Sequence, residues 1–114
     1  MITNTITMRI IQRFDPRHES QFMALERRFA ELEAARPDYP KGARLQPISA
    51  GEPVNTLIWE CDFPNLEAAQ RALDLFAGDG AHEELFRDQA PFINDVRIEF
   101  CQRLLFSPEG NKSS

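Results

Sequence analysis

The sequence predicts a single α+β domain in which strands and helices follow the order β-α-β-β-α-β. Three observations support this: segments of alternating polar and apolar residues, segments with apolar residues every three or four positions, and clusters of Pro and Gly between them. The 114 residues can bury one hydrophobic core, and 42% hydrophobic with 27% charged residues is typical of a globular protein. We expect residues 1–106 to form the domain and 107–114 to form a flexible C-terminal tail.

The first half of the chain predicts a strand, a helix and a second, weaker strand. Polar–apolar alternation predicts the first strand over residues 5–14. An Asp-Pro pair then begins a helix, and apolar residues at steps of three and four extend it to Arg36, which precedes a proline. Residues 43–50 predict the second strand. Pro47 cannot donate a ladder hydrogen bond, so this strand is expected at a sheet edge.

The second half repeats the pattern with clearer signals. Alternation predicts a strand over residues 55–63 and a final strand over residues 94–105. Between them, a stripe of apolar residues predicts a helix over residues 66–77. A Gly-Asp-Gly sequence at 78–80 ends it, because these residues tolerate a positive φ. A short helix over residues 81–90 follows.

Right-handed crossovers favour a four-stranded antiparallel sheet in the order 4-1-3-2, with both helices on one face. This ferredoxin-like arrangement leaves the other face of the sheet uncovered. Because side chains alternate between the two faces of a strand, we expect that face to mix isoleucines with charged residues. The residues predicted to bind a ligand there are Arg9, Arg13, Glu60, Arg97, Glu99 and Arg103. A regular second strand would add Arg44, Gln46 and Ile48.

Two interpretations of the uncovered face stay open. Opposite charges on neighbouring strands of a solvated sheet form ion pairs that stabilise by a few tenths to about 1 kcal/mol each. Alternatively, two such sheets face each other in a homodimer and enclose an Arg-rich cavity. Guanidinium groups bind carboxylates in a bidentate fork, so such a cavity would orient a small organic molecule that is anionic or polar. The mixture of Ile with Arg and Glu favours the dimer.

Composition argues against several classes of protein. A net charge of -5 at pH 7 disfavours nucleic-acid binding, since phosphate-backbone binders cluster Lys and Arg. No segment approaches the roughly 20 apolar residues that span a bilayer, and the N-terminus does not resemble a secretion signal. We therefore expect a cytoplasmic protein, with no membrane partner, in which Cys61 and Cys101 are reduced. No metal or cofactor is expected, because the sequence lacks zinc, phosphate-loop and dinucleotide motifs.

Three segments of the second half resemble a known family. They are Asn55-Thr-Leu-Ile-Trp59-Glu, the helix from Leu66 through Arg71-Ala-Leu73, and the short helix with Phe86 and Pro91. Together they resemble the NIPSNAP family of the dimeric α/β barrel superfamily, to which antibiotic-biosynthesis monooxygenases also belong. The resemblance implies a homodimer whose two sheets close a barrel. It implies no single reaction, because the superfamily includes oxygenases, isomerases and decarboxylases.

His82 is where the sequence departs from the family pattern, which has an aromatic residue near the start of the short helix. We consider His82 a candidate general base at the barrel mouth, and Glu60 a candidate acid or base if a dimer buries it. Trp59 lies on the helix-facing side by alternation, either in the core or in a cavity wall. The leading hypothesis is a small-molecule binding protein; the alternatives are a cofactor-independent monooxygenase or isomerase, and a protein-interaction module.

Overall fold

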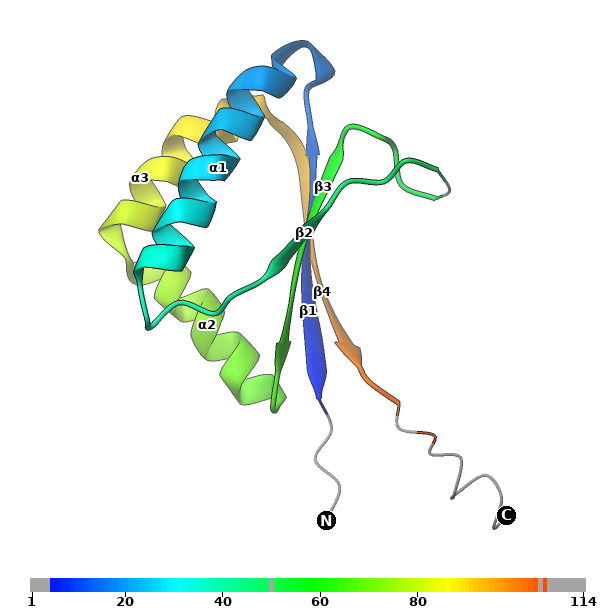
Figure 1. Cartoon of the computed structure of the whole chain (residues 1–114), viewed down its shortest axis with the longest axis vertical. Helices are drawn as coiled ribbons and strands as arrows, with labels where there is room; N and C mark the ends of the chain where they lie inside the picture. Colours follow the sequence, from blue (N-terminus) through cyan, green and yellow to red (C-terminus); the bar gives the residue numbers. More distant parts are fainter. Residues whose placement is uncertain (1–4, 50, 105, 107–114) are drawn as a thin grey trace.

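The computed structural model describes residues 5–49, 51–104 and 106, and it has the predicted order of elements with two short additions (Figure 1). A 3-10 turn precedes the first helix and a second one precedes the last strand, while the second helical region is two helices, as predicted. The elements are β1 (Ile6–Phe14), η1 (Pro16–His18), α1 (Glu19–Ala35), β2 (Ala43–Leu45), β3 (Thr56–Phe63), α2 (Leu66–Gly78), α3 (Gly80–Gln89), η2 (Ala90–Phe92) and β4 (Ile93–Gln102).

The four strands form one antiparallel sheet in the order β2-β3-β1-β4. This is the predicted order 4-1-3-2 counted from the opposite edge, so the predicted α+β, ferredoxin-like topology is confirmed. All three helices lie on one side of the sheet, and the segment between β2 and β3 projects to the other side (Figure 1). None of the helices in the described part of the chain has the length and apolar character required to cross a membrane.

The helix boundaries follow from local capping. Asp15 accepts a hydrogen bond from the backbone N–H of Arg17 and so opens the turn that leads into α1. Asn65 caps α2 in the same way through the N–H of Ala68, at 2.8 Å. Asp79 both ends α2 and caps α3, because its side chain accepts from the N–H of His82. One short polar residue therefore separates the two helices.

The second strand is shorter than predicted, and its register places Arg44 on the helix-facing side of the sheet. It spans only Ala43–Leu45, since Pro47 cannot continue the ladder. Its register pairs Arg44 with Trp59, which lies on the helix-facing side of β3. The prediction that Arg44 joins the uncovered face is therefore wrong. One short pairing decides the register, and a shift of one residue exchanges the two faces.

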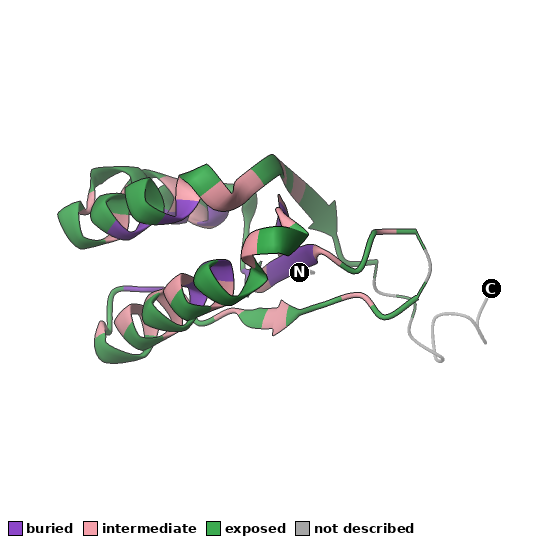
Figure 2. Cartoon of the chain, turned by 90° about the horizontal axis from the view of Figure 1, so that it is seen from above, coloured by how far each residue is buried: buried purple, intermediate pink, exposed green. Residues whose placement is uncertain are grey.

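Buried residues lie on both the helices and the sheet (purple in Figure 2), and the core that they form is divided into two clusters. One cluster gathers around Met8, Trp59 and Phe63, and the other around Phe14 and Phe22. In β1 the helix-facing positions between Met8 and Phe14 are residues 10 and 12. The side chains at those two positions line a cavity, and Ile10 also packs against the first cluster.

A candidate ligand cavity between the helices and the sheet

The cavity has a volume of about 300 Å³ and lies on the helix-covered side of the sheet. Its walls are mainly aromatic and aliphatic, with a few polar groups, as is common in sites for small organic molecules. The aromatic lining residues are Phe29, Tyr39, Trp59, Phe76 and Phe86. The polar and charged ones are Gln12, Glu26, Glu33, Arg44, His82, Glu83 and Gln89.

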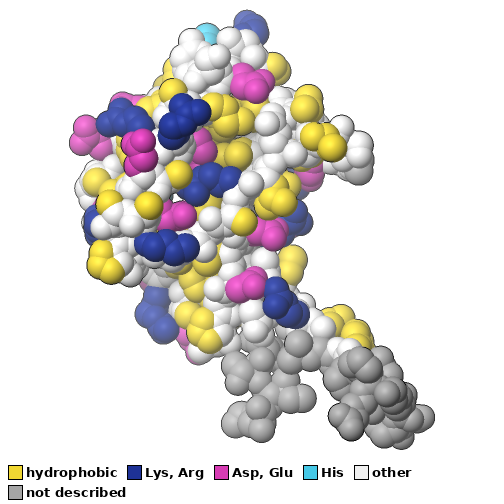
Figure 3. Space-filling model, viewed as in Figure 1, with side chains coloured by type: hydrophobic (Ala, Val, Ile, Leu, Met, Phe, Trp, Pro, Cys, Tyr) yellow, Lys and Arg dark blue, Asp and Glu magenta, His cyan; other side chains and the backbone are white. Residues whose placement is uncertain are grey.

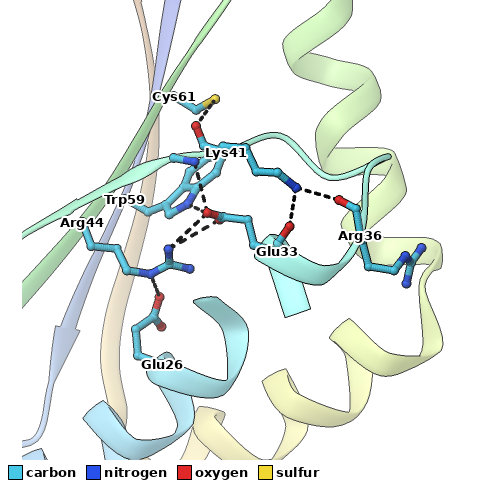
Figure 4. A network of polar contacts seen from close by, with 8 residues as sticks. Glu26, Glu33, Arg36, Lys41, Arg44, Trp59 and Cys61 are labelled. Carbon is cyan, nitrogen blue, oxygen red and sulfur yellow. Dashed lines mark hydrogen bonds and ion pairs between the residues drawn. The ribbon is translucent and has the colours of Figure 1, made fainter. Parts of the chain in front are cut away.

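A network of charged groups crosses the cavity from α1 to the sheet (Figure 4). The Nε of Arg44 donates to Glu26 at 2.7 Å, and one of its terminal nitrogens lies 3.4 Å from the carboxylate of Glu33. The indole N–H of Trp59 donates to Glu33 at 2.9 Å. Exposed fractions are only 10% for the Glu26 side chain and 12% for Glu33, against 22% for Arg44. Two buried carboxylates therefore share one guanidinium.

Glu26 and Glu33 are not among the predicted site residues, although the sequence of α1 contains a signal for them. The apolar stripe of α1 includes Phe22 and Phe29, and each glutamate follows one of these residues by four positions. Residues four apart lie on the same face of a helix, so both carboxylates face inward rather than toward solvent. Gln12 gave a second signal, since it is a polar residue at a helix-facing position of β1.

Gln89 is fully buried, and one of its polar atoms is left without a partner. Its amide nitrogen donates to the carbonyl oxygen of Phe22 at 3.3 Å and to Glu26 at 3.0 Å. Both partners are acceptors, so the amide must turn its nitrogen toward them. The Oε1 of Gln89 then has no hydrogen-bond partner among the described residues. An unsatisfied buried acceptor costs about 1–3 kcal/mol, and this one is inaccessible to solvent.

His82 lines the other end of the cavity. Its ring stacks on Phe76 at a centroid distance of 4.9 Å and lies at the same distance from Phe29. Burial lowers the pKa of His82 below its ordinary value, because desolvation disfavours the charged imidazolium. Its Nδ1 is buried without a hydrogen-bond partner in the described part of the chain. The predicted candidate thus lies in the cavity wall; its role as a general base stays a prediction.

Asp79 ties the segment after α1 to the start of α3. Its carboxylate accepts from Arg36 at 2.9 Å and from the hydroxyl of Tyr39 at 2.8 Å. These donors, with the backbone N–H of His82, hold the pKa of Asp79 at about 2. Burial, together with this hydrogen bond, raises the pKa of Tyr39 above its ordinary value. The contacts position the Tyr39 ring beside His82 in the cavity wall.

The uncovered face brings the predicted site residues together as ion pairs. Arg9 lies 3.2 Å from Glu60 and 3.9 Å from Glu99, and Arg97 lies 3.8 Å from Glu99. Arg103 lies 2.8 Å from a carboxylate of β3. Arg97 also lies 2.6 Å from Glu52 of the β2–β3 segment. Basic and acidic side chains also alternate over the surface seen in Figure 3. These contacts match the ion-paired interpretation, and ligand binding at this face stays a prediction.

Two predicted residues of that face have no role in the cavity. Glu60, the second catalytic candidate, is paired with Arg9 on the side of the sheet away from the helices. Arg13 belongs to the same face, and its Nε is buried without a hydrogen-bond partner in residues 5–49, 51–104 and 106.

Cys61 and Cys101 are free thiols. Within the same described ranges, no three His, Cys, Asp or Glu side chains are grouped to hold a metal ion.

Comparison with known proteins identifies the fold. No protein-family model and no curated protein matches the chain in sequence. Among solved structures, a NIPSNAP family protein from Agrobacterium tumefaciens superposes with a TM-score of 0.75 at 14% identity, over 96% of this chain and 94% of that one. An uncharacterized NIPSNAP-like domain protein from Burkholderia xenovorans gives 0.75 at 17% identity, over 94% and 91%.

A third similar structure is SnoaB from Streptomyces nogalater, described as a cofactor-independent oxygenase. It superposes with a TM-score of 0.62 at 12% identity, covering 91% of this chain and 97% of that one. Identities this low establish likeness of fold alone. The chain therefore has the fold of NIPSNAP family proteins and related oxygenase-like proteins, which confirms at the level of the fold the resemblance predicted from the sequence.

Proposed function

We propose that this protein binds a small organic molecule with an aromatic body in the cavity between the helices and the sheet. The observation that carries the proposal is the divided core. A chain of this size ordinarily packs its interior without large voids, whereas here a cavity of about 300 Å³, partly open to solvent, is lined by aromatic side chains and a few polar groups. Keeping such a space costs stability, and a ligand that fills it would restore the lost contacts.

The cavity supports this function better than the uncovered face does. On that face the guanidinium groups of Arg9, Arg97 and Arg103 already have carboxylate partners, so an anionic ligand would have to displace them. In the cavity, Arg44 is likewise engaged by two carboxylates. Among the described lining residues, Arg44 is the only arginine or lysine, and Arg13 lies on the other face of the sheet, so we propose a cavity ligand that is not an anion.

We further propose that the protein is a homodimer formed through the uncovered face. The β2–β3 segment on that side carries Ile48 and Val54, which are 95% and 64% exposed. Burial of such side chains against a second sheet would remove apolar surface from water. Native mass spectrometry should show a dimer for the wild type and a monomer for Ile48→Glu. A monomeric wild type would instead favour a partner of a different sequence on this face.

The test of ligand binding blocks the cavity with one bulky side chain. Ala77 is exposed at the cavity wall, whereas Ala81 is exposed nearby and does not line it. Melting temperatures are measured with a panel of small aromatic molecules. We expect stabilisation of the wild type and of Ala81→Trp, and its loss in Ala77→Trp. Equal stabilisation of both variants would refute the cavity as the site. Loss of binding only in an Arg97→Ala, Arg103→Ala double variant would move the site to the uncovered face.

A second candidate function is catalysis of proton transfer by His82, with a cofactor-independent oxygenase or isomerase as the corresponding class. The observation that favours it is a half-buried imidazole in the cavity wall with a lowered pKa, which leaves it uncharged and able to accept a proton near neutral pH. Oxygen uptake and solvent deuterium exchange are followed with quinol-type substrates. Turnover that is lost in His82→Gln would support catalysis; turnover unchanged in that variant would exclude His82 as the base.

A further inference from the structure

The exposure of the lining residues shows where the cavity opens. Tyr39, from the segment after α1, and Trp59 of β3 line the cavity and are buried. Phe86 of α3 and Val96 and Ile98 of β4 also line it, but these three side chains are 41% to 46% exposed. The closed end of the cavity therefore lies toward β3, and its mouth lies between α3 and the edge strand β4.

The apolar lining of the mouth continues along β4 beyond the cavity. Residues 96, 98 and 100 of β4 pair with residues 12, 10 and 8 of β1, so their side chains share the helix-facing side of the sheet. Phe100 is 42% exposed and does not line the cavity. Gln102 is the next residue on this side and ends the apolar run. The β4 stripe, which consists of Val96, Ile98 and Phe100, is continuous with the cavity because two of its three residues belong to both.

This continuity indicates what covers the β4 stripe. Contiguous exposed apolar surface often marks a ligand groove or an interaction site. The residues of β4 that face the other way, Arg97 and Glu99, are charged, so the strand is apolar only on the side of the cavity. A molecule that is seated in the cavity reaches the stripe through the mouth without crossing polar surface of β4. Glu83, on the α3 side of the mouth, is exposed and acidic, so it disfavours a negatively charged chain.

We propose that the ligand of this cavity carries an uncharged apolar chain, which leaves through the mouth and lies along the β4 stripe. This deepens the proposed function and rests on it. From Ile98 to Phe100 the strand rises about 7 Å. Staggered carbon–carbon bonds of about 1.5 Å cover that distance with a chain of about five to six carbons. The aromatic ring stays in the cavity, and the chain removes the exposed side chains of the stripe from water.

The test is a homologous series of phenols that are uncharged at pH 7: 4-ethylphenol, 4-butylphenol and 4-hexylphenol. Their affinities for the wild-type protein are measured by isothermal titration calorimetry. A fully buried methylene group raises affinity about fourfold, and one that contacts protein on one side raises it about twofold. We therefore expect 4-hexylphenol to bind about tenfold more tightly than 4-ethylphenol, or better. If the three affinities agree within about threefold, the chain proposal is overturned while the proposed function stands. If none of the three binds, the proposed function fails with it.

A variant of Phe100 tests the path of the chain. Phe100→Thr shortens an exposed side chain of β4 and keeps a residue that favours strands. Leu45→Thr is the matched control, because Leu45 is 44% exposed, belongs to the opposite edge strand and does not line the cavity. We expect Phe100→Thr to weaken 4-hexylphenol about fivefold and to leave 4-ethylphenol within about twofold, with the control unchanged for both. Equal affinity of the two variants for 4-hexylphenol would overturn the assignment of the stripe.

The variant Ala77→Trp tests whether the cavity and the β4 stripe hold one molecule. Its bulky side chain blocks the cavity and leaves the residues of the stripe in place. We expect this variant to lose both 4-ethylphenol and 4-hexylphenol in the same titrations. If 4-hexylphenol binds Ala77→Trp as tightly as the wild type, the stripe binds apolar chains without the cavity, and the proposal is overturned.

Discussion

Replacing Arg44 by Met should destabilise the protein more than the loss of any surface ion pair. The change leaves the buried carboxylates of Glu26 and Glu33 without their shared cation. Removing one partner of a fully buried pair costs about 3–5 kcal/mol. Here Glu33 keeps the indole N–H of Trp59, Glu26 keeps the amide of Gln89, and some solvent reaches Arg44. We therefore expect a loss of about 2–4 kcal/mol in the free energy of unfolding.

Urea unfolding at pH 7 measures this loss, followed by the fluorescence of Trp59, the single tryptophan of the chain. Protein concentration is held constant, because dimerisation would make apparent stability concentration-dependent. With a slope of roughly 1–1.5 kcal/mol per molar urea, the midpoint should fall by about 2 M. Arg17→Met is the control: the ion pair of Arg17 with Asp15 is nearly as short, at 2.8 Å, but the Arg17 side chain is 84% exposed. That variant should match the wild type.

A triple variant separates charge from packing. Adding Glu26→Gln and Glu33→Gln to Arg44→Met removes the uncompensated charges while it keeps the volumes of the side chains. Most of the lost stability should return, because neutral amides are far less costly to bury than carboxylates. If Arg44→Met loses less than about 1 kcal/mol, or the triple variant is no better than the single one, the buried charge network is not what we describe.

Three further predictions follow from single contacts. Because the pKa of Asp79 is held at about 2, its contribution to stability is complete above pH 4 and is lost as the pH falls from about 4 to about 2. Asp79→Asn should therefore remove that part of the pH dependence of urea unfolding. An unchanged pH profile in this variant would contradict the prediction. At Gly42 an added Cβ would overlap the Trp59 ring, so Gly42→Ala should lower the free energy of unfolding by about 1–3 kcal/mol, measured by calorimetry. A Cβ added at Gly78, in α2, meets open space, so Gly78→Ala should be neutral or stabilise by about 0.5–1 kcal/mol. Asn65→Ala should cost about 0.5–2 kcal/mol through loss of the α2 cap, and a loss under 0.3 kcal/mol by urea unfolding would rule out that cap.

Much of the fold could be predicted from local pattern. Alternation identified β1, β3 and β4 to within three residues at each end, and the capping residues Asp15 and Asn65 marked where the helical segments begin. These signals depend on neighbours in the chain, so a single sequence contains them. Handedness of the crossovers then left one favoured order of strands, and the structure has that order.

The candidate site depended on contacts that no local pattern specifies. Alternation placed Trp59 on the helix-facing side of the sheet, but the sequence could not say whether it lies in a filled core or in a cavity wall. Arg44 faces the cavity because β2 pairs with β3 in one of two registers, and three residues of pairing decide it. Glu26 and Glu33 gain their meaning only when Arg44 is brought to them across the edge of the sheet.

The sequence by itself therefore determined the order of elements, the helix ends and the charged character of the uncovered face. Tertiary structure decided which face holds the cavity, which carboxylates share a cation and which acceptor of Gln89 lacks a donor. The physical reason is the distance along the chain over which each effect acts. Periodicity and capping act over a few neighbouring residues, whereas packing density and charge balance depend on groups as far apart in the chain as Glu26 and Gln89.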